Sequence, residues 1–170
     1  VRKEMGIVLQ DPYLFTGTIA SNVTMGNEAI DDAAVWQALE RVGAKDMVRR
    51  LPQGIQAPVF EKGATYSSGE RQLISFARTL AADPKILILD EATSHIDTET
   101  EEIIQHAMKV VSQGRTTFII AHRLSTIQDA DLILVLHEGQ IVERGNHQTL
   151  LAQDGRYAEM YRMQLQQANG

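Results

Sequence analysis

The pattern of apolar and polar positions divides the chain into short apolar runs and longer stretches in which apolar residues recur at helical spacing. Residues 86–89 are all apolar, and because this run is too short for a membrane span it predicts a fully buried central strand. Residues 116–121 predict a second strand, and residues 6–9 predict a shorter one that ends in a turn, since Pro12 cannot continue a ladder. Strands that alternate with helices predict a largely parallel α/β sheet.

Helical spacing of the remaining apolar residues predicts helices at about 32–42, 44–51, 70–82, 97–113, 125–129, 146–152 and 155–166. A hairpin is predicted between residues 132 and 143, with its turn at Glu138-Gly139. Thr16-Gly17-Thr18 and Ser21-Asn22 are predicted to break the chain, and residues 52–65 to form a loop. The helical stretch 18–82 therefore interrupts the sheet as an insertion.

Two carboxylates, Asp90 and Glu91, directly follow the predicted central strand. In open α/β sheets ligands bind at the carboxyl ends of the strands. Two carboxylates at such a place are costly without a cation or a water molecule to act on. Phosphoryl transfer uses such a pair, one carboxylate for Mg²⁺ and one for the attacking water. An acidic helix cap is the alternative, and the pair alone does not exclude it.

Three further places carry candidate chemistry. Gln10 ends the first strand, where it could contact a ligand or cap the turn. The residues 67–69, Ser-Ser-Gly, precede a helix, so the free N–H groups there suit either an anion or an ordinary N-cap. His122 ends the strand at 116–121, at the same type of sheet edge as the carboxylates.

Composition limits the function classes. The chain has 170 residues, of which 44% are hydrophobic and 22% charged, as in a globular domain with a sizeable core. Its 16 basic and 22 acidic residues give a net charge of −6, which argues against an extended nucleic-acid surface. It has no cysteine, so disulfides and thiolate metal sites are excluded. No signal peptide or membrane span is evident, and the start at Val1 predicts a piece of a longer polypeptide.

Taken in order, these segments resemble the C-terminal two-thirds of the nucleotide-binding domain of an ATP-binding cassette (ABC) exporter, over essentially all of the chain. Six motifs in the family's order make this resemblance specific. They are Leu9-Gln10-Asp11-Pro12 for the Q-loop, Glu61-Lys62-Gly63 for the X-loop, Tyr66-Ser67-Ser68-Gly69-Glu70 for the signature, residues 86–91 for Walker B with the catalytic glutamate, Ser94-His95-Ile96-Asp97 for the D-loop and His122-Arg123 for the H-loop. Within exporters the likeness is greatest to one half of a bacterial heterodimeric multidrug transporter.

The resemblance implies a partial P-loop NTPase (RecA-like) fold with ATP and Mg²⁺ as ligands. Residues 1–17 and 83–170 would form the incomplete RecA-like core, and residues 18–82 the inserted α-helical ABC subdomain. Asp90 would hold Mg²⁺ through water, and Glu91 would polarise the water that attacks the γ-phosphate. His122 would contact that phosphate, and Gln10 would sense Mg²⁺ and the water and link the site to the transmembrane domain.

The resemblance also implies partners. In this family two nucleotide-binding domains enclose two ATP molecules head to tail, so the signature residues Ser67, Ser68, Gly69 and Glu70 would serve the nucleotide of the opposing subunit. Asp97 would contact the partner across that interface. The chain would work at the cytoplasmic face of the cell membrane, attached to its own transmembrane domain, and would power efflux of drugs or lipids.

Two departures from the family pattern matter. The signature usually reads Leu-Ser-Gly-Gly-Gln, whereas Tyr66, Ser68 and Glu70 stand here at its first, third and fifth positions. Ser68 adds a side chain where close approach to phosphate is wanted, and Glu70 adds negative charge, so the site that this signature completes is expected to be the weaker one. The phosphate-binding motif Gly-x-x-x-x-Gly-Lys-Ser/Thr does not occur in the chain, so ATP hydrolysis by these 170 residues alone is expected to be poor or absent.

Two other interpretations stay open beside the exporter ATPase. One is a soluble ABC-type ATPase of translation or DNA repair, against which the exporter-type Q-loop, Glu61-Lys62-Gly63 and the acidic balance speak. The other is a non-catalytic interaction fragment. Strand edges left unpaired in a partial sheet would also favour self-association.

Overall fold

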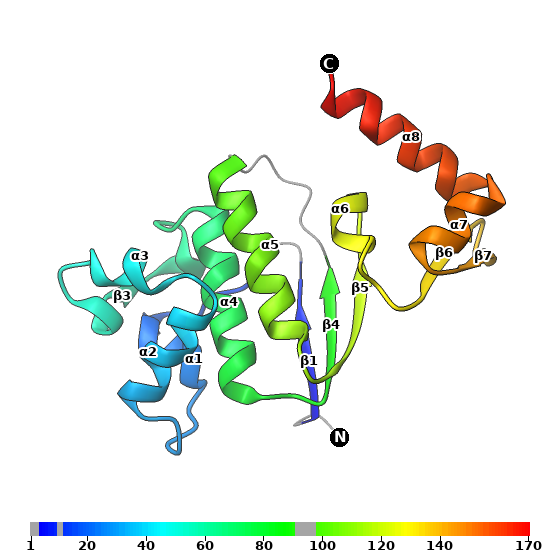
Figure 1. The fold of residues 1–170 in the computed structure, drawn as a ribbon. Helices are drawn as coiled ribbons and strands as arrows, with labels where there is room; N and C mark the ends of the chain where they lie inside the picture. Colours follow the sequence, from blue (N-terminus) through cyan, green and yellow to red (C-terminus); the bar gives the residue numbers. More distant parts are fainter. Residues whose placement is uncertain (1–3, 10–11, 91–97) are drawn as a thin grey trace. The chain divides into compact units, whose positions relative to one another are not determined.

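The computed structural model describes residues 4–9, 12–90 and 98–170 (Figure 1). The chain divides into two compact units, Val1–Ile120 and Ala121–Gly170. The division predicted from the family resemblance, with a helical insertion at 18–82, stays a prediction.

A three-stranded parallel sheet forms the centre of the first unit. Its strands are β1 (Met5–Val8), β4 (Ile86–Asp90) and β5 (Thr116–Ile120), in the order β1-β4-β5. Parallel neighbours require crossover connections, and the chain supplies them as the helical segments between these strands. The predicted parallel α/β sheet is therefore confirmed.

The central strand β4 is buried on one face only, which corrects the prediction of a fully buried strand. Leu87 and Leu89 are almost inaccessible, whereas 37% of Ile86 is exposed. Successive side chains point to opposite faces of a strand, and the inward residues join one core with helices α4 (Ser68–Ala82) and α5 (Thr98–Ser112). Figure 1 shows both helices on the same side of the sheet. The run of apolar residues therefore indicates that the strand lies in the middle of the sheet, and does not indicate that both of its faces are buried.

Shorter elements complete the first unit. They are β2 (Gly17–Thr18), α1 (Ile19–Thr24), α2 (Asp32–Arg41), α3 (Lys45–Arg49), the 3₁₀ helix η2 (Gly54–Gln56), β3 (Pro58–Val59) and the 3₁₀ helix η3 (Glu61–Gly63). The predicted start of α2 is confirmed, because the Asp31 carboxylate accepts a hydrogen bond from the Ala34 N–H at 2.8 Å. The predicted loop at 52–65 instead contains β3, which pairs antiparallel with β2, and the two 3₁₀ turns.

The predicted chain break at Ser21-Asn22 is wrong, because both residues lie inside helix α1. Thr18 and Ser21 form a capping box in which the Thr18 side chain accepts from the Ser21 N–H. Asn22 is 1% exposed, and its side-chain amide donates to the Thr18 carbonyl one turn earlier. Residue types that usually favour turns are therefore kept in a helix by hydrogen bonds to their side chains.

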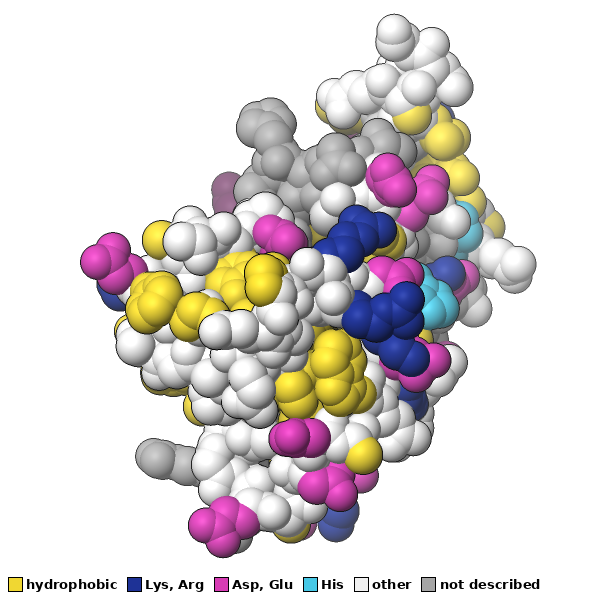
Figure 2. Space-filling model, turned by 90° about the vertical axis from the view of Figure 1, so that its left-hand side faces the viewer, with side chains coloured by type: hydrophobic (Ala, Val, Ile, Leu, Met, Phe, Trp, Pro, Cys, Tyr) yellow, Lys and Arg dark blue, Asp and Glu magenta, His cyan; other side chains and the backbone are white. Residues whose placement is uncertain are grey.

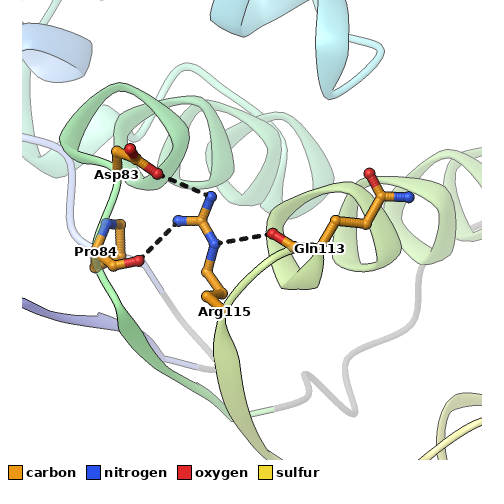
Figure 3. A network of polar contacts seen from close by, with 4 residues as sticks. All are labelled: Asp83, Pro84, Gln113 and Arg115. Atoms are coloured by element: carbon orange, nitrogen blue, oxygen red, sulfur yellow. Dashed lines mark hydrogen bonds and ion pairs between the residues drawn. The ribbon is translucent and has the colours of Figure 1, made fainter.

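Arg115 joins the chain segments at the edge of the sheet where β4 and β5 begin (Figure 3). Its guanidinium donates to the Pro84 carbonyl at 3.2 Å and the Gln113 carbonyl at 3.5 Å, and it pairs with the Asp83 carboxylate at 3.3 Å. The Arg115 side chain is 8% exposed. These contacts hold the ends of α4 and α5 beside the strands that follow them.

The second unit contains α6 (Leu124–Ile127), β6 (Ile133–His137), β7 (Gln140–Gly145), α7 (His147–Gln153) and α8 (Arg156–Ala168). The predicted hairpin is confirmed: β6 and β7 pair antiparallel, and Glu138 and Gly139 adopt the left-handed conformation that a two-residue turn requires. Leu124, Ile133, Leu150 and Tyr157 form its small core.

Candidate functional site

Asp90 ends the central strand β4, at the carboxyl edge of the parallel sheet. It is partly buried and lies in register with Ile120, the last residue of β5. This position agrees with the expectation from the sequence that a carboxylate stands where open α/β sheets bind ligands. Two further acidic candidates, Glu91 and Asp97, lie outside the described residues, as does Gln10.

His122 lies in the second unit, two residues after β5, and is exposed. Gln164 of helix α8 holds the main chain that directly follows His122. The Gln164 amide nitrogen donates to the His122 carbonyl at 3.0 Å, and the amide oxygen accepts from the Leu124 N–H at 2.9 Å. No local pattern indicates this role for Gln164, because its partners lie about 40 positions earlier in the chain.

The start of helix α4 carries the signature-like residues and forms a capping box. The Ser67 hydroxyl accepts from the Glu70 N–H at 3.1 Å, and the Glu70 carboxylate accepts from the Ser67 N–H at 2.8 Å. Both alternatives at this site, N-cap and anion site, use the same N–H groups. The spacing Ser-x-x-Glu could have predicted the capping box from sequence. An anion at this helix start would have to compete with the Glu70 carboxylate.

Gly69 is buried where helices α4 and α5 approach each other. A Cβ atom at this position would lie 2.6 Å from the Thr100 Cγ2 atom, closer than carbon atoms pack. The glycine is therefore required by packing within the chain.

Tyr66 stands three positions before Gly69, and its hydroxyl donates to the Pro58 carbonyl at 3.1 Å. Burial, with a smaller contribution from the Glu70 charge, raises the pKa of the Tyr66 hydroxyl.

The structure brings together two motifs that stand almost 50 residues apart in the sequence, the segment after Gln10 and Glu61-Lys62-Gly63. Leu14 is fully buried, and a Cβ atom on Gly63 would lie 2.9 Å from its Cδ1 atom. Lys62 adopts a left-handed conformation, φ 62°, and its ammonium lies 5.9 Å from the centre of the Tyr13 ring. Close approach of η3 to Leu14 therefore needs glycine at position 63.

Arg78 and Asn22 are further residues that sequence reasoning missed. Arg78 of helix α4 donates to the Asn22 carbonyl, the Asn22 side-chain oxygen and the Tyr13 carbonyl, at 2.8, 3.0 and 3.1 Å. Burial lowers the pKa of the Arg78 guanidinium. One signal in the sequence could have indicated this position. Arg78 stands between Ala77 and Leu80 of the predicted helix, close to its inner side, where a charged side chain is unusual.

Charged side chains of both signs lie on the same face of the molecule (Figure 2). On the face of the molecule shown in Figure 2, lysine and arginine side chains alternate with acidic side chains, and small apolar patches lie between them. Among the described residues no three His, Asp or Glu side chains gather as a metal site. Within the same residues, no helix is both long and apolar enough to span a bilayer.

Comparisons with known proteins agree with these features. The family model described as ABC transporter matches residues 1–94, which is more than half of the chain. A probable multidrug resistance ABC transporter ATP-binding/permease protein, YheH of Bacillus subtilis, is 64% identical over 96% of the chain and 24% of its own length. An ATP-dependent lipid A-core flippase of Saccharophagus degradans is 49% identical over 96% of the chain and 28% of its own length.

A solved structure of a bacterial Atm1-family ABC exporter with ATP bound superposes with a TM-score of 0.85 at 47% identity. It is matched over 96% of this chain and 28% of its own. The chain therefore spans about a quarter of the length of the relatives that it matches. Together these matches show that the chain belongs to the ABC transporter family, with the partial P-loop NTPase fold that the resemblance implies.

Proposed function

We propose that this chain is part of the ATP-hydrolysing domain of an ABC exporter that powers efflux of drugs or lipids at the cytoplasmic face of a membrane. One observation carries the proposal: Asp90 stands at the carboxyl end of the central strand of a parallel sheet, and Glu91 follows it in sequence. The relatives are described as ATP-binding/permease proteins, which favours a transporter over a soluble ATPase of translation or repair.

The residues fit a magnesium nucleotide. Mg²⁺ binds to proteins through one or two carboxylates and completes its octahedron with water and substrate phosphates. The partly buried Asp90 carboxylate supplies one such group, so a cluster of three protein ligands is not needed. The bound ion would neutralise charge on the phosphates, and Asp90 would hold it through water.

The remaining roles follow from position and from the family. Glu91 would accept the proton of the attacking water, and Gln10 would orient that water. His122 would donate a hydrogen bond to the γ-phosphate, where negative charge develops in the transition state.

Binding across a subunit interface is the second part of the proposal. Ser67, Ser68 and Gly69 would face the nucleotide of a second, heterodimeric ATP-binding domain, and Asp97 would contact that domain. Since the Glu70 carboxylate already accepts from the Ser67 N–H, this signature would hold the partner's phosphate weakly. The hydrolytic site would then be the one that Asp90 and Glu91 serve.

The replacement Glu91→Gln in the full-length protein tests the proposal. It removes the general base but keeps the size of the side chain, so we expect ATP hydrolysis to fall by roughly 10²–10⁴-fold while ATP binding is retained. Release of phosphate and binding of a fluorescent ATP analogue are the two measurements. Glu99→Gln, on an exposed position in the first turn of α5, is the matched control and should hydrolyse ATP normally. Unchanged turnover in Glu91→Gln would refute the role of Glu91.

A further inference from the structure

Two parts of the chain that are distant in the sequence, helix α4 and the stretch 13–22, meet at the guanidinium of Arg78. Its Nε and Nη2 atoms donate to the carbonyl and side-chain oxygens of Asn22 in helix α1, and its Nη1 atom donates to the carbonyl of Tyr13. The first partner lies 56 residues away in the chain and the second 65 residues away. The planar fork of a guanidinium can make all three bonds at once, which an ammonium cannot do in the same geometry.

Asn22 extends this network to the main chain of Phe15. Its side-chain oxygen accepts from the Phe15 N–H at 2.8 Å, and its side-chain nitrogen donates to the Phe15 carbonyl at 2.9 Å. The Asn22 side chain is almost completely buried, so these bonds are shielded from water. Arg78 and Asn22 thus fix the polar main-chain atoms of residues 13–15 on both sides of Leu14.

The side chains of this short segment alternate between the core and the surface. Leu14 is fully buried, whereas Tyr13 and Phe15 are 49% and 47% exposed. The two rings contact each other edge to face, with centres 4.8 Å apart, and the Arg78 guanidinium lies 5.6 Å from the Phe15 ring. Two large aromatic side chains are therefore held at the surface on a main chain that cannot adjust freely.

We propose that Arg78 and Asn22 act as a clamp, the Arg78 clamp, which makes residues 13–15 move as one body with helix α4. The helix that carries the clamp is the same one that begins at Ser67–Gly69, and residue 13 follows Gln10 by three positions. The clamp would keep the chain after Gln10 aligned with the signature end of α4. The functional part of this inference rests on the proposed roles of Gln10 and Ser67–Gly69, whereas the clamp itself rests on the contacts given above.

Arg78 is accordingly a positioning residue, which acts through the main chain of another segment. Its described partners are carbonyl and amide oxygens and an aromatic ring, with no carboxylate among them. An arginine that only neutralised charge would be found beside an acid. Arg115 is the internal comparison, because it also donates to main-chain carbonyls but pairs with a carboxylate, that of Asp83, at the C-terminal ends of α4 and α5.

Limited proteolysis with chymotrypsin, which cleaves after aromatic residues, tests the clamp in the full-length protein. We expect the wild type to resist cleavage after Tyr13 and Phe15, because a clamped main chain cannot enter a protease active site. In Arg78→Met we expect cleavage there to be roughly tenfold faster or more, since three main-chain and side-chain acceptors lose their donor. Arg115→Met is the matched control and should leave cleavage at these two bonds unchanged. Mass spectrometry of the fragments identifies the bonds.

Arg78→Lys keeps the positive charge but loses the fork, and it serves where Arg78→Met is not recovered in folded form. We expect about threefold faster cleavage in this variant, between the wild type and Arg78→Met. Wild-type cleavage rates in Arg78→Met and in Arg78→Lys would overturn the clamp. An equal increase in Arg115→Met would also overturn it, because the effect would then reflect general loss of stability.

Steady-state ATP hydrolysis by the same preparations tests the functional part. We expect kcat to fall by about tenfold in Arg78→Met with less than a twofold change in KM for ATP, because the residues at the start of α4 keep their own capping box. Two results for Arg78→Met would overturn the link between the clamp and ATP hydrolysis. One is a raised KM with an unchanged kcat, and the other is an unchanged kcat in a variant that is cleaved rapidly at residues 13–15. If the wild type does not hydrolyse ATP, the proposed function fails while the cleavage experiment still decides the clamp.

Discussion

Two arginines of the first unit, the partly buried Arg78 and Arg115 with its side chain 8% exposed, form hydrogen-bond networks that connect different parts of the chain. Arg115 closes the turns where α4 and α5 end, and its partners lie at most 32 residues away. Arg78 holds a segment 65 residues distant and also donates to Asn22, a buried polar side chain that bonds the same segment at Phe15. One network fastens neighbouring elements, and the other fixes a surface segment that is otherwise supported by the single buried side chain of Leu14.

The difference between the two networks predicts where the loss of a hydrogen bond should affect function. Around Arg115 the carboxylate partner Asp83 is 84% exposed, so water can replace much of what the network provides. The Asn22 side chain is 1% exposed, so its removal leaves the polar atoms that it contacts without a partner and with little access to water, although the bond from Arg78 to the Tyr13 carbonyl is itself exposed. Replacements at the Arg78 clamp should therefore loosen residues 13–18, and replacements around Arg115 should have a smaller effect that is confined to the start of β4 and β5.

The largest effect is expected for Asn22→Ala. This replacement removes the partners of the Phe15 N–H, the Phe15 carbonyl and the Thr18 carbonyl and one acceptor of Arg78. We expect the free energy of local opening at residues 13–18 to fall by about 3 kcal/mol, or roughly a hundredfold in amide exchange rate. Hydrogen exchange of the full-length protein, followed by mass spectrometry, measures this change.

Asn27→Ala provides the control for that replacement. Asn27 also accepts a main-chain hydrogen bond, from the Ala29 N–H at 3.0 Å, but the contact is exposed. We expect a change of about 0.5 kcal/mol or less at this site and none at residues 13–18. Equal acceleration by the two alanine variants would mean that burial is not what distinguishes the clamp.

The sequence predicted those parts of the fold that depend on local pattern. Helical spacing located α2, α4 and α5, and the apolar runs located the parallel strands, because each of these signals lies within one element. Helix α1 was missed, since Ser21 and Asn22 favour turns unless distant groups satisfy them. The two-residue ladder between β2 and β3 was missed for a similar reason: it depends on residues about 40 positions apart.

The candidate site was predictable to the same extent. Asp90 could be placed because a strand and its carboxyl end can be read from the residues around them. The need for glycine at position 69 could not be seen, because it arises from Thr100 on a different helix. The roles of Glu91, Gln10, Asp97 and His122 stay predictions, since they depend on a nucleotide and on relations between parts of the chain.

Arg115→Met is expected to have an intermediate effect. It removes the donor to the Pro84 and Gln113 carbonyls but leaves the main-chain bonds from Lys85 N–H to the Glu4 carbonyl and from Thr116 N–H to the Lys85 carbonyl. We expect local opening at the start of β4 and β5 to become easier by about 1–2 kcal/mol, seen as faster exchange of those amides. Arg41→Met, at an exposed position ending α2, should leave them unchanged. Faster exchange at residues 13–18 instead would remove the distinction between the two arginines.

The smallest effect is expected for Asp83→Asn, which removes the carboxylate charge from the Arg115 network. Asp83 ends helix α4 in the left-handed conformation, φ 47°, which asparagine also tolerates, so the helix end should be kept. The Asp83 carboxylate of this ion pair is 84% exposed, and ion pairs with an exposed partner contribute about 0.5 kcal/mol or less to the free energy of unfolding. We therefore expect amide exchange at Lys85 and Thr116 to change by no more than about twofold, and to be as insensitive to salt as in the wild type. A loss as large as that of Arg115→Met would show that the ion pair, and not the donation to the two carbonyls, holds this edge of the sheet.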